Sequence, residues 1–138
     1  RTLNNLGETN LNLGNKVVAA ESCDAALVIF QELGELVEQV NVHNNLGRIA
    51  HADGRYEAAK LSFARALAGG LALGLAIARV ASRFYLARLL ADDKSLVFSL
   101  PDAISALQAV LKETVVLEAP TLEADIKREL AAALACTG

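Results

Sequence analysis

The sequence predicts an all-α protein, a solenoid of three helical hairpins followed by one further helix. Three observations support this prediction. Residues 1–40 and 41–80 resemble each other at a fixed offset of 40 positions. Apolar residues within each unit recur every three or four positions, which places them on one face of a helix. The alternation typical of strands is poor, and the 138 residues include only two prolines to break helices.

The repeat is an ungapped match in which twelve of forty positions are identical. Asn4-Asn5-Leu6-Gly7 returns as Asn44-Asn45-Leu46-Gly47, and Leu33-Gly34 returns as Leu73-Gly74. A weaker third copy places Arg88 where the second unit has Arg48. We therefore expect units at about 1–40, 41–80 and 81–120, with a partial fourth at 121–138. Because the chain contains no methionine, we expect it to be a piece of a longer protein.

The second unit shows its two helices most clearly. The first helix has one apolar face, formed by Val42, Leu46, Ile49 and Ala50. Asp53-Gly54 is expected to end it, since glycine readily adopts a left-handed C-cap. The second helix continues the spacing with Tyr56, Ala59, Phe63, Ala66 and Leu67. We expect Gly69-Gly70 to fray the end of this second helix.

The third unit departs from the pattern at its turn. Lys94 replaces the turn glycine, and Ser95 to Pro101 indicates a connection about four residues longer than the earlier ones. Proline suits the first turn of a helix, so Pro101-Asp102 and Pro120-Thr121 are predicted helix starts. The last helix is expected near residues 121–135.

These units resemble the tetratricopeptide repeat, whose helix–turn–helix unit carries Leu-Gly in one helix and Ala-x-x-x-Phe in the next. Leu46-Gly47 and Ala59-x-x-x-Phe63 match this pattern, and Leu6-Gly7 with Ala19-x-x-x-Cys23 matches it in the first unit. The period of 40 and the Asn-Asn-Leu-Gly helix are similar to the forty-residue subclass of kinesin light chains and bacterial regulators. The resemblance implies a right-handed superhelix in which the first helix of each unit lines a concave groove.

Two features of the first helices predict how they pack. Gly7 and Gly47 lie inside a helix, where glycine is roughly 0.5–1 kcal/mol less favourable than alanine. Close approach of the paired helix would explain glycine at this site. Equivalent leucines should also form one row along the stack, made up of Leu6, Leu46, Leu86 and Leu130.

The resemblance implies a set of partner-binding residues on the groove: Asn4, Glu8, Asn44, Arg48, His51, Phe84, Arg88 and Arg128. Asparagine amides can donate to and accept from a peptide backbone, and arginine can bind a carboxylate with two hydrogen bonds. Arg48 and Arg88 occupy equivalent places, so stacking should align them in a basic stripe that Arg128 extends. The alternative that the asparagines are ordinary polar surface or inter-repeat residues and the arginines are solvated remains open.

Several other classes of protein are disfavoured. His43 and His51 are eight residues apart, too far for a metal pair on one helix turn, and no nucleophile elbow or phosphate loop occurs. We therefore expect no catalytic residue, metal or cofactor. Residues 66–78 form the longest uncharged run, short of the roughly 20 residues that cross a bilayer. A net charge of −3 disfavours nucleic-acid binding, and two distant cysteines suit a reducing, cytoplasmic location.

The sequence therefore predicts a non-enzymatic scaffold for protein–protein interaction in a multidomain regulatory or signalling protein. Its partner is expected to be a peptide or domain with acidic side chains or a carboxylate. Two alternatives remain. One is an oligomerisation module or structural spacer whose exposed stack ends pair with another copy. The other is an effector-sensing module.

Overall fold

The computed structural model describes residues 16–95 and 97–137, and these residues form helices and no strand. The helices are α2 (Lys16–Leu33), α3 (Leu36–Ala52), α4 (Tyr56–Leu73), α5 (Ala76–Ala91), α6 (Leu100–Val116) and α7 (Pro120–Thr137). The predicted first helix, with Gly7, lies outside the described residues.

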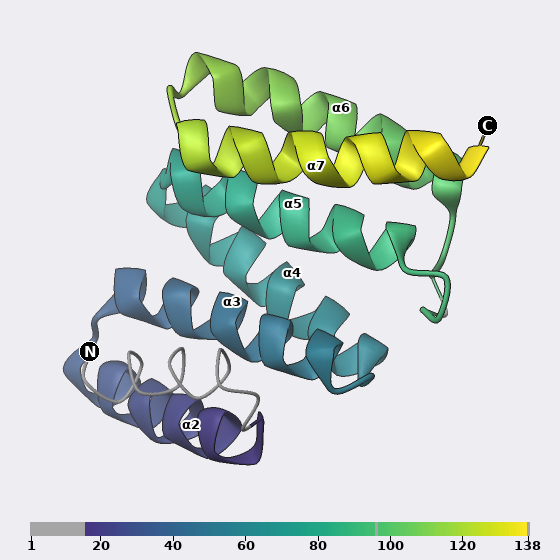
Figure 1. Ribbon diagram of the computed structural model, residues 1–138. Helices are drawn as coiled ribbons and strands as arrows, with labels where there is room; N and C mark the ends of the chain where they lie inside the picture. Colours follow the sequence, from purple (N-terminus) through teal and green to yellow (C-terminus); the bar gives the residue numbers. More distant parts are fainter. Residues whose placement is uncertain (1–15, 96, 138) are drawn as a thin grey trace.

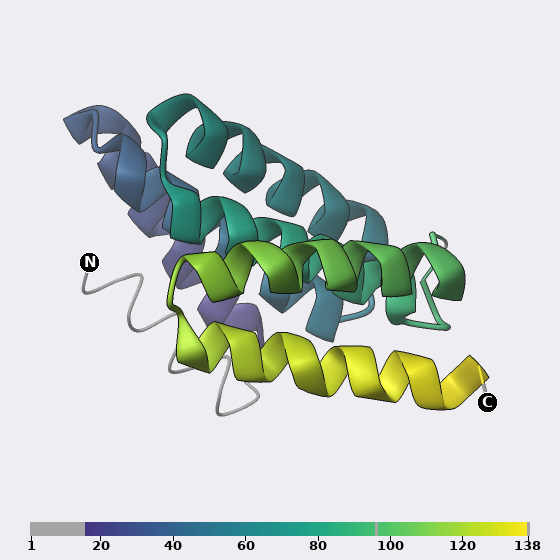
Figure 2. The same cartoon turned by 90° about the horizontal axis from the view of Figure 1, so that it is seen from above.

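The helices stack in two layers (Figures 1 and 2). Each helix packs against the next one along the chain, and α3 also contacts α5, which in turn contacts α7. One layer is therefore α3, α5 and α7, and the other is α2, α4 and α6. The predicted helical-repeat solenoid is confirmed. The turns between units lie at 34–35, 74–75 and 117–119. The first two come several residues before the unit ends expected at about 40 and 80, and the third lies next to the end expected at about 120.

The turns depend on residues with positive φ. Gly34, Gly54 and Gly74 have φ of 69°, 75° and 68°, so the expected left-handed glycine after α3 is confirmed at Gly54. After α6 the same conformation falls on Glu118, with φ of 55°. Glu118 follows Gly74 by 44 positions, the offset that the longer connection in the third unit creates.

The prediction that Gly69-Gly70 frays α4 is wrong, since the helix continues to Leu73 and ends at a left-handed Gly74. Close packing explains both glycines. A Cβ at Gly69 would lie 2.6 Å from Val40 Cγ2, and one at Gly70 would lie 3.3 Å from the Arg79 backbone nitrogen. The pair therefore lets α3 and α5 approach the end of α4, and that packing outweighs the low helix propensity of glycine.

The longer connection before α6 is confirmed. Three residues separate α3 from α4, whereas residues 92–99 separate α5 from α6. The Ser99 N–H donates to Leu90 O at 2.9 Å, which holds the end of the connection against α5. Pro101 lies in the first turn of α6 and Pro120 begins α7, as predicted.

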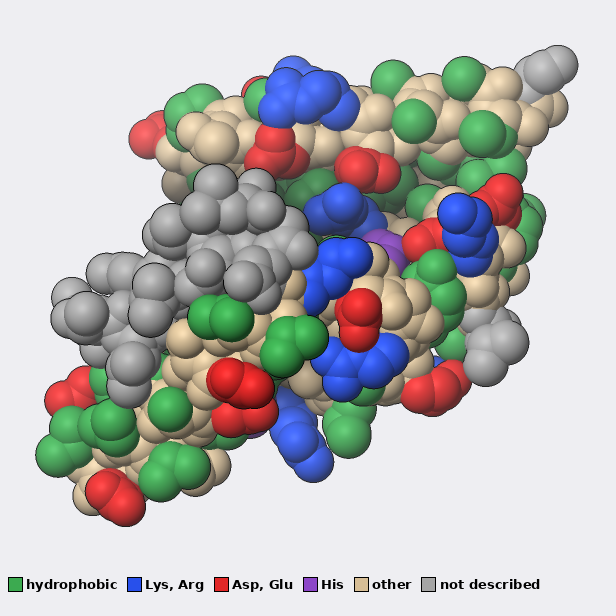
Figure 3. All heavy atoms as spheres, turned by 60° about the horizontal axis from the view of Figure 1, so that its bottom comes forward, with side chains coloured by type: hydrophobic (Ala, Val, Ile, Leu, Met, Phe, Trp, Pro, Cys, Tyr) green, Lys and Arg blue, Asp and Glu red, His purple; other side chains and the backbone are tan. Residues whose placement is uncertain are grey.

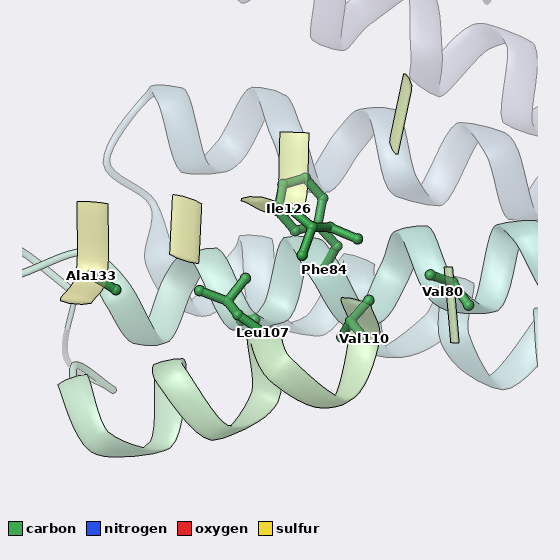
Figure 4. Close-up of a cluster of buried hydrophobic side chains, with 7 residues drawn as sticks. Val80, Phe84, Leu107, Val110, Ile126 and Ala133 are labelled. Carbon is green, nitrogen blue, oxygen red and sulfur yellow. The ribbon is translucent and has the colours of Figure 1, made fainter. Parts of the chain in front are cut away.

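The interior is divided into three successive hydrophobic clusters, as expected for a solenoid. The predicted leucine row crosses them, because Leu46, Leu86 and Leu130 are each partly buried against a different cluster. In the last cluster Phe84 of α5 and Ile126 of α7 point toward each other above Leu107 and Val110 of α6 (Figure 4). This cluster fixes the relative positions of the helices that line the candidate site.

Candidate protein-binding groove

A groove of about 870 Å³ runs between α3 and α5. Val37 and Ile77 lie at the ends where these helices begin, and Arg48 and Tyr85 lie further along. Two smaller hollows, of about 490 and 390 Å³, continue the groove toward the α3 C-terminus and toward α7. Arg48 and Tyr85 line all three spaces, so they form the centre of the site.

Tyr85 is held by contacts with α3 and α4. Its ring stacks on Phe63 of α4, with centroids 5.2 Å apart and an interplanar angle of 24°. The Arg48 guanidinium carbon lies 5.7 Å from the Tyr85 centroid, within the range of a cation–π contact. Phe63 is itself buried, so the tyrosine rests on a rigid support. The contacts with Phe63 and with Arg48 therefore hold the Tyr85 ring as a fixed aromatic surface in the groove.

The charged groups around Tyr85 are mixed in sign. Arg88 lies 3.4 Å from Glu129 and within 5.8 Å of the Phe84 centroid, and Arg128 pairs with Asp125 one turn earlier. Arg48, by contrast, has no carboxylate within 4.0 Å among the described residues. Figure 3 shows Lys or Arg, Asp or Glu, and histidine side chains gathered in the hollowed middle of one face. The basic stripe expected from the sequence is therefore partly neutralised by acidic side chains.

His51 and Asp92 connect α3 to the residue that follows α5. His51 Nε2 donates to Asp92 Oδ2 at 2.8 Å, and the His51 ring meets Tyr56 edge to face. Burial raises the pKa of the Asp92 carboxyl. Hydrogen bonds from the Lys94 N–H and from His51, together with the positive charges of these two residues, lower it by more. The pKa of Asp92 is therefore lowered. The carboxylate stays ionised and holds this end of the groove together.

Buried polar residues join α3 to α5 below the groove. Ser82 Oγ donates to Asn44 Oδ1 at 2.9 Å and also lies 3.0 Å from Ala78 O. Ser82 is fully buried, Asn44 is 8% exposed and Asn45 is 5% exposed. Because the amide of Asn44 is engaged between helices, Asn44 acts here mainly as an inter-repeat residue. Asn41, one turn earlier, is the exposed asparagine on the groove.

The predicted site residues divide into three groups. Asn4 and Glu8 lie outside the described residues. The structure brings Arg48, His51, Arg88 and Arg128 together around Tyr85. Asn44 and Phe84 line the groove walls but are almost fully buried, with Phe84 3% exposed.

Tyr85 is a central residue of the site that is missing from the set expected from the sequence. Its spacing contained a usable signal. Tyr85 lies three residues before Arg88 on a helix expected to line the groove, so the two share one face.

Comparison with protein-family models decides which family the chain belongs to, since the model described as "Tetratricopeptide repeat" matches residues 1–70. The chain belongs to the tetratricopeptide repeat family. Comparisons with curated proteins and with solved structures found no match. Tetratricopeptide repeats are generally non-catalytic scaffolds that mediate protein–protein interactions.

Three further findings concern this tetratricopeptide repeat chain. Within residues 16–95 and 97–137, no group of three or more His, Cys, Asp or Glu side chains could hold a metal ion. No helix in the same ranges is long and apolar enough to span a membrane. Cys23 is buried and Cys136 is exposed, and neither forms a disulfide within the part of the chain that the structure describes.

Proposed function

We propose that this tetratricopeptide repeat protein binds a peptide segment of a partner protein in the groove formed by α3, α5 and α7. The observation that carries the proposal is the convergence of Arg48 and Tyr85 on all three connected hollows. A rigid aromatic residue and an arginine at the centre of a concave surface are the residue types most enriched among binding hot spots.

The chemistry of the groove favours a partner segment with an acidic side chain or a carboxylate. Arg48 is partly buried and has no acidic partner among the described residues, so its guanidinium has hydrogen-bond donors to offer. Arg88 and Arg128 already contact carboxylates and would have to exchange partners to bind another acid. Arg48 is therefore the proposed primary anchor, with Arg88 and Arg128 supporting it.

Asn41 supports recognition of an extended backbone. It is exposed on α3, two turns before Arg48, and lines the same groove. Its amide can donate to a peptide carbonyl and accept from a peptide N–H. A segment lying along α3 would therefore meet an amide, an aromatic ring and a cation in succession.

Selection of peptides from a displayed random library would test this proposal. We expect enriched peptides to contain Asp, Glu or a free C-terminus and to lose binding to Tyr85→Ala and Arg48→Glu. Lys60→Glu is a matched charge reversal on an exposed residue of α4, away from the groove, and should retain binding. Enriched peptides that bind all three variants equally would place the binding surface elsewhere.

Self-association through a stack end is a second candidate function. The observation that favours it is the exposure of Leu134 on α7, at 46%, together with exposed Ala131 and Ala135 on the same helix. Sedimentation of the chain over a range of concentrations tests it. A dimer that Leu134→Glu converts to a monomer would support the spacer function over the scaffold.

A further inference from the structure

The turns that join one repeat to the next lie along a single edge of the stack (Figure 1). Each comprises the last turn of α2, α4 or α6, the connection, and the first turn of the following helix. We call residues 30–39, 70–79 and 113–123 the repeat-junction edge. The turns within repeats lie on the opposite side, at residues 49–59 and 88–103.

The repeat-junction edge exposes an unusual amount of apolar side chain. Helix ends contribute Leu33, Leu73 and Val116, which are 64%, 37% and 79% exposed. Helix starts contribute Leu36 and Ile77, which are 54% and 50% exposed. Residues 49–59 and 88–103 expose one large hydrophobic side chain among their described positions, Phe98. Apolar surface gathered on one edge in this way is typical of an interaction surface.

A small hollow opens beside this row and offers a place for an apolar side chain. It has a volume of about 250 Å³ and lies between α3 and α4, beside Leu36 and Leu73. Val40 and Ala72 add to its apolar lining, while Gln39, His43 and Arg65 complete the wall. The volume suits one aliphatic side chain rather than a small-molecule ligand, since ligand pockets are generally larger.

The charge of the same edge indicates what would bind there. It contains six glutamates and one basic residue, Arg79. Arg79 already lies 3.3 Å from Glu113. Glu32, Glu35 and Glu118 are exposed and form no ion pair with another described residue. A second copy of this edge would bring like charges together, whereas a basic surface would complement it.

We propose that the repeat-junction edge docks a basic amphipathic helix of a partner protein. The apolar face of that helix packs on the exposed row, and its Lys or Arg side chains reach Glu32, Glu35 and Glu118. Packed helices lie roughly 8–10 Å apart, so the three successive turns span about 20 Å. A helix of about 13 residues has that length. This surface is separate from the centre of the groove, so the proposal does not depend on the proposed function.

A designed peptide provides the test. The probe is a fluorescent 14-residue Leu/Lys peptide with leucines at helical spacing on one face, and the control has the same composition with the leucines scattered. Anisotropy titrations with the 138-residue chain should show the probe binding at least about tenfold more tightly than the control. Two edge variants should each weaken binding of the probe by about fivefold or more. One is the triple variant Glu32→Gln, Glu35→Gln and Glu118→Gln, and the other is the double variant Leu33→Ser and Val116→Ser.

The groove variant Arg48→Glu should bind the probe as tightly as the parent chain, which separates this surface from the groove. Three outcomes would overturn the proposal: no saturable binding of the probe, equal affinity for probe and scattered control, or insensitivity to both edge variants. Loss of binding in Arg48→Glu alone would assign the probe to the groove instead.

Discussion

The ring of Phe63 fills the space in which a side chain at residue 47 would lie. A Cβ at Gly47 would be 2.4 Å from Phe63 Cε1, closer than real Cβ contacts come. The same ring stacks on Tyr85 of the next repeat. The absence of a side chain at Gly47 thus allows α3 and α4 to approach closely, and it also supports the tyrosine at the centre of the groove.

Gly47→Leu should therefore destabilise the protein by about 1–3 kcal/mol, because the added side chain must displace Phe63 from a packed interior. Chemical denaturation followed by circular dichroism measures the loss. Ala52→Leu introduces the same side chain at an exposed position of the same helix and should change stability by less than about 0.5 kcal/mol. A denaturation midpoint for Gly47→Leu equal to that of Ala52→Leu would contradict the packing.

Replacing the left-handed glutamate after α6 should stabilise the fold. Glu118→Gly removes a strained φ of 55° and is expected to add about 0.5–1 kcal/mol, after allowance for the flexibility of glycine in the unfolded chain. Glu118→Ala removes the charge but keeps the Cβ, so it should bring no comparable gain. Thermal unfolding compares the variants. An equal gain in both would assign the effect to charge rather than to backbone conformation.

Ser82 and Asn44 belong to successive repeats, and their hydrogen bond should make their contributions to stability depend on each other. Ser82→Ala leaves a buried amide without its partner and should cost about 1–3 kcal/mol. Asn44→Ala should have a comparable effect, and the double variant should lose less than the sum of the two. Denaturation of the four chains gives the coupling energy. Strictly additive losses would mean that the two side chains contribute independently.

Stability should fall as the medium becomes acidic, in part through His43. Burial lowers the pKa of His43, and the charge of Arg65 lowers it further. The folded protein therefore takes up this proton later than the unfolded chain as the pH falls through about 6.5. His43→Gln should flatten the decline in the free energy of unfolding between about pH 7 and 5. Arg65→Gln, which removes the smaller cause, should flatten it less. An unchanged slope in His43→Gln would rule out this contribution.

Much of the fold could be predicted from the forty-residue period, because each unit repeats the same local pattern of apolar positions and turn residues. Gly69-Gly70 could not be interpreted in this way. Local propensity indicates fraying there, whereas Val40 and Arg79 from neighbouring helices require the absence of side chains. Only a contact distant in sequence explains why the helix continues.

The candidate site was predictable to a smaller extent. Equivalent positions in successive units placed Arg48 and Arg88 on one surface, as stacking requires. The carboxylates that pair with Arg88 and Arg128 are Glu129 and Asp125. Both belong to α7, where the match to the repeat is weak, so the sequence did not predict that they neutralise part of the stripe. The role of Asn44 depends on Ser82 of the next repeat, a pairing that the pattern of a single unit does not reveal.

Calorimetry can show whether a peptide binds at the centre of the groove. One groove-selected peptide is titrated into the parent chain, into Arg48→Glu and into Lys60→Glu. All three titrations use the same low-salt buffer, and helix content is checked by circular dichroism. A segment anchored at Arg48 should lose at least about tenfold in affinity for Arg48→Glu and keep its parental affinity for Lys60→Glu. Equal affinities for the parent and Arg48→Glu would contradict binding at the centre of the α3–α5–α7 groove.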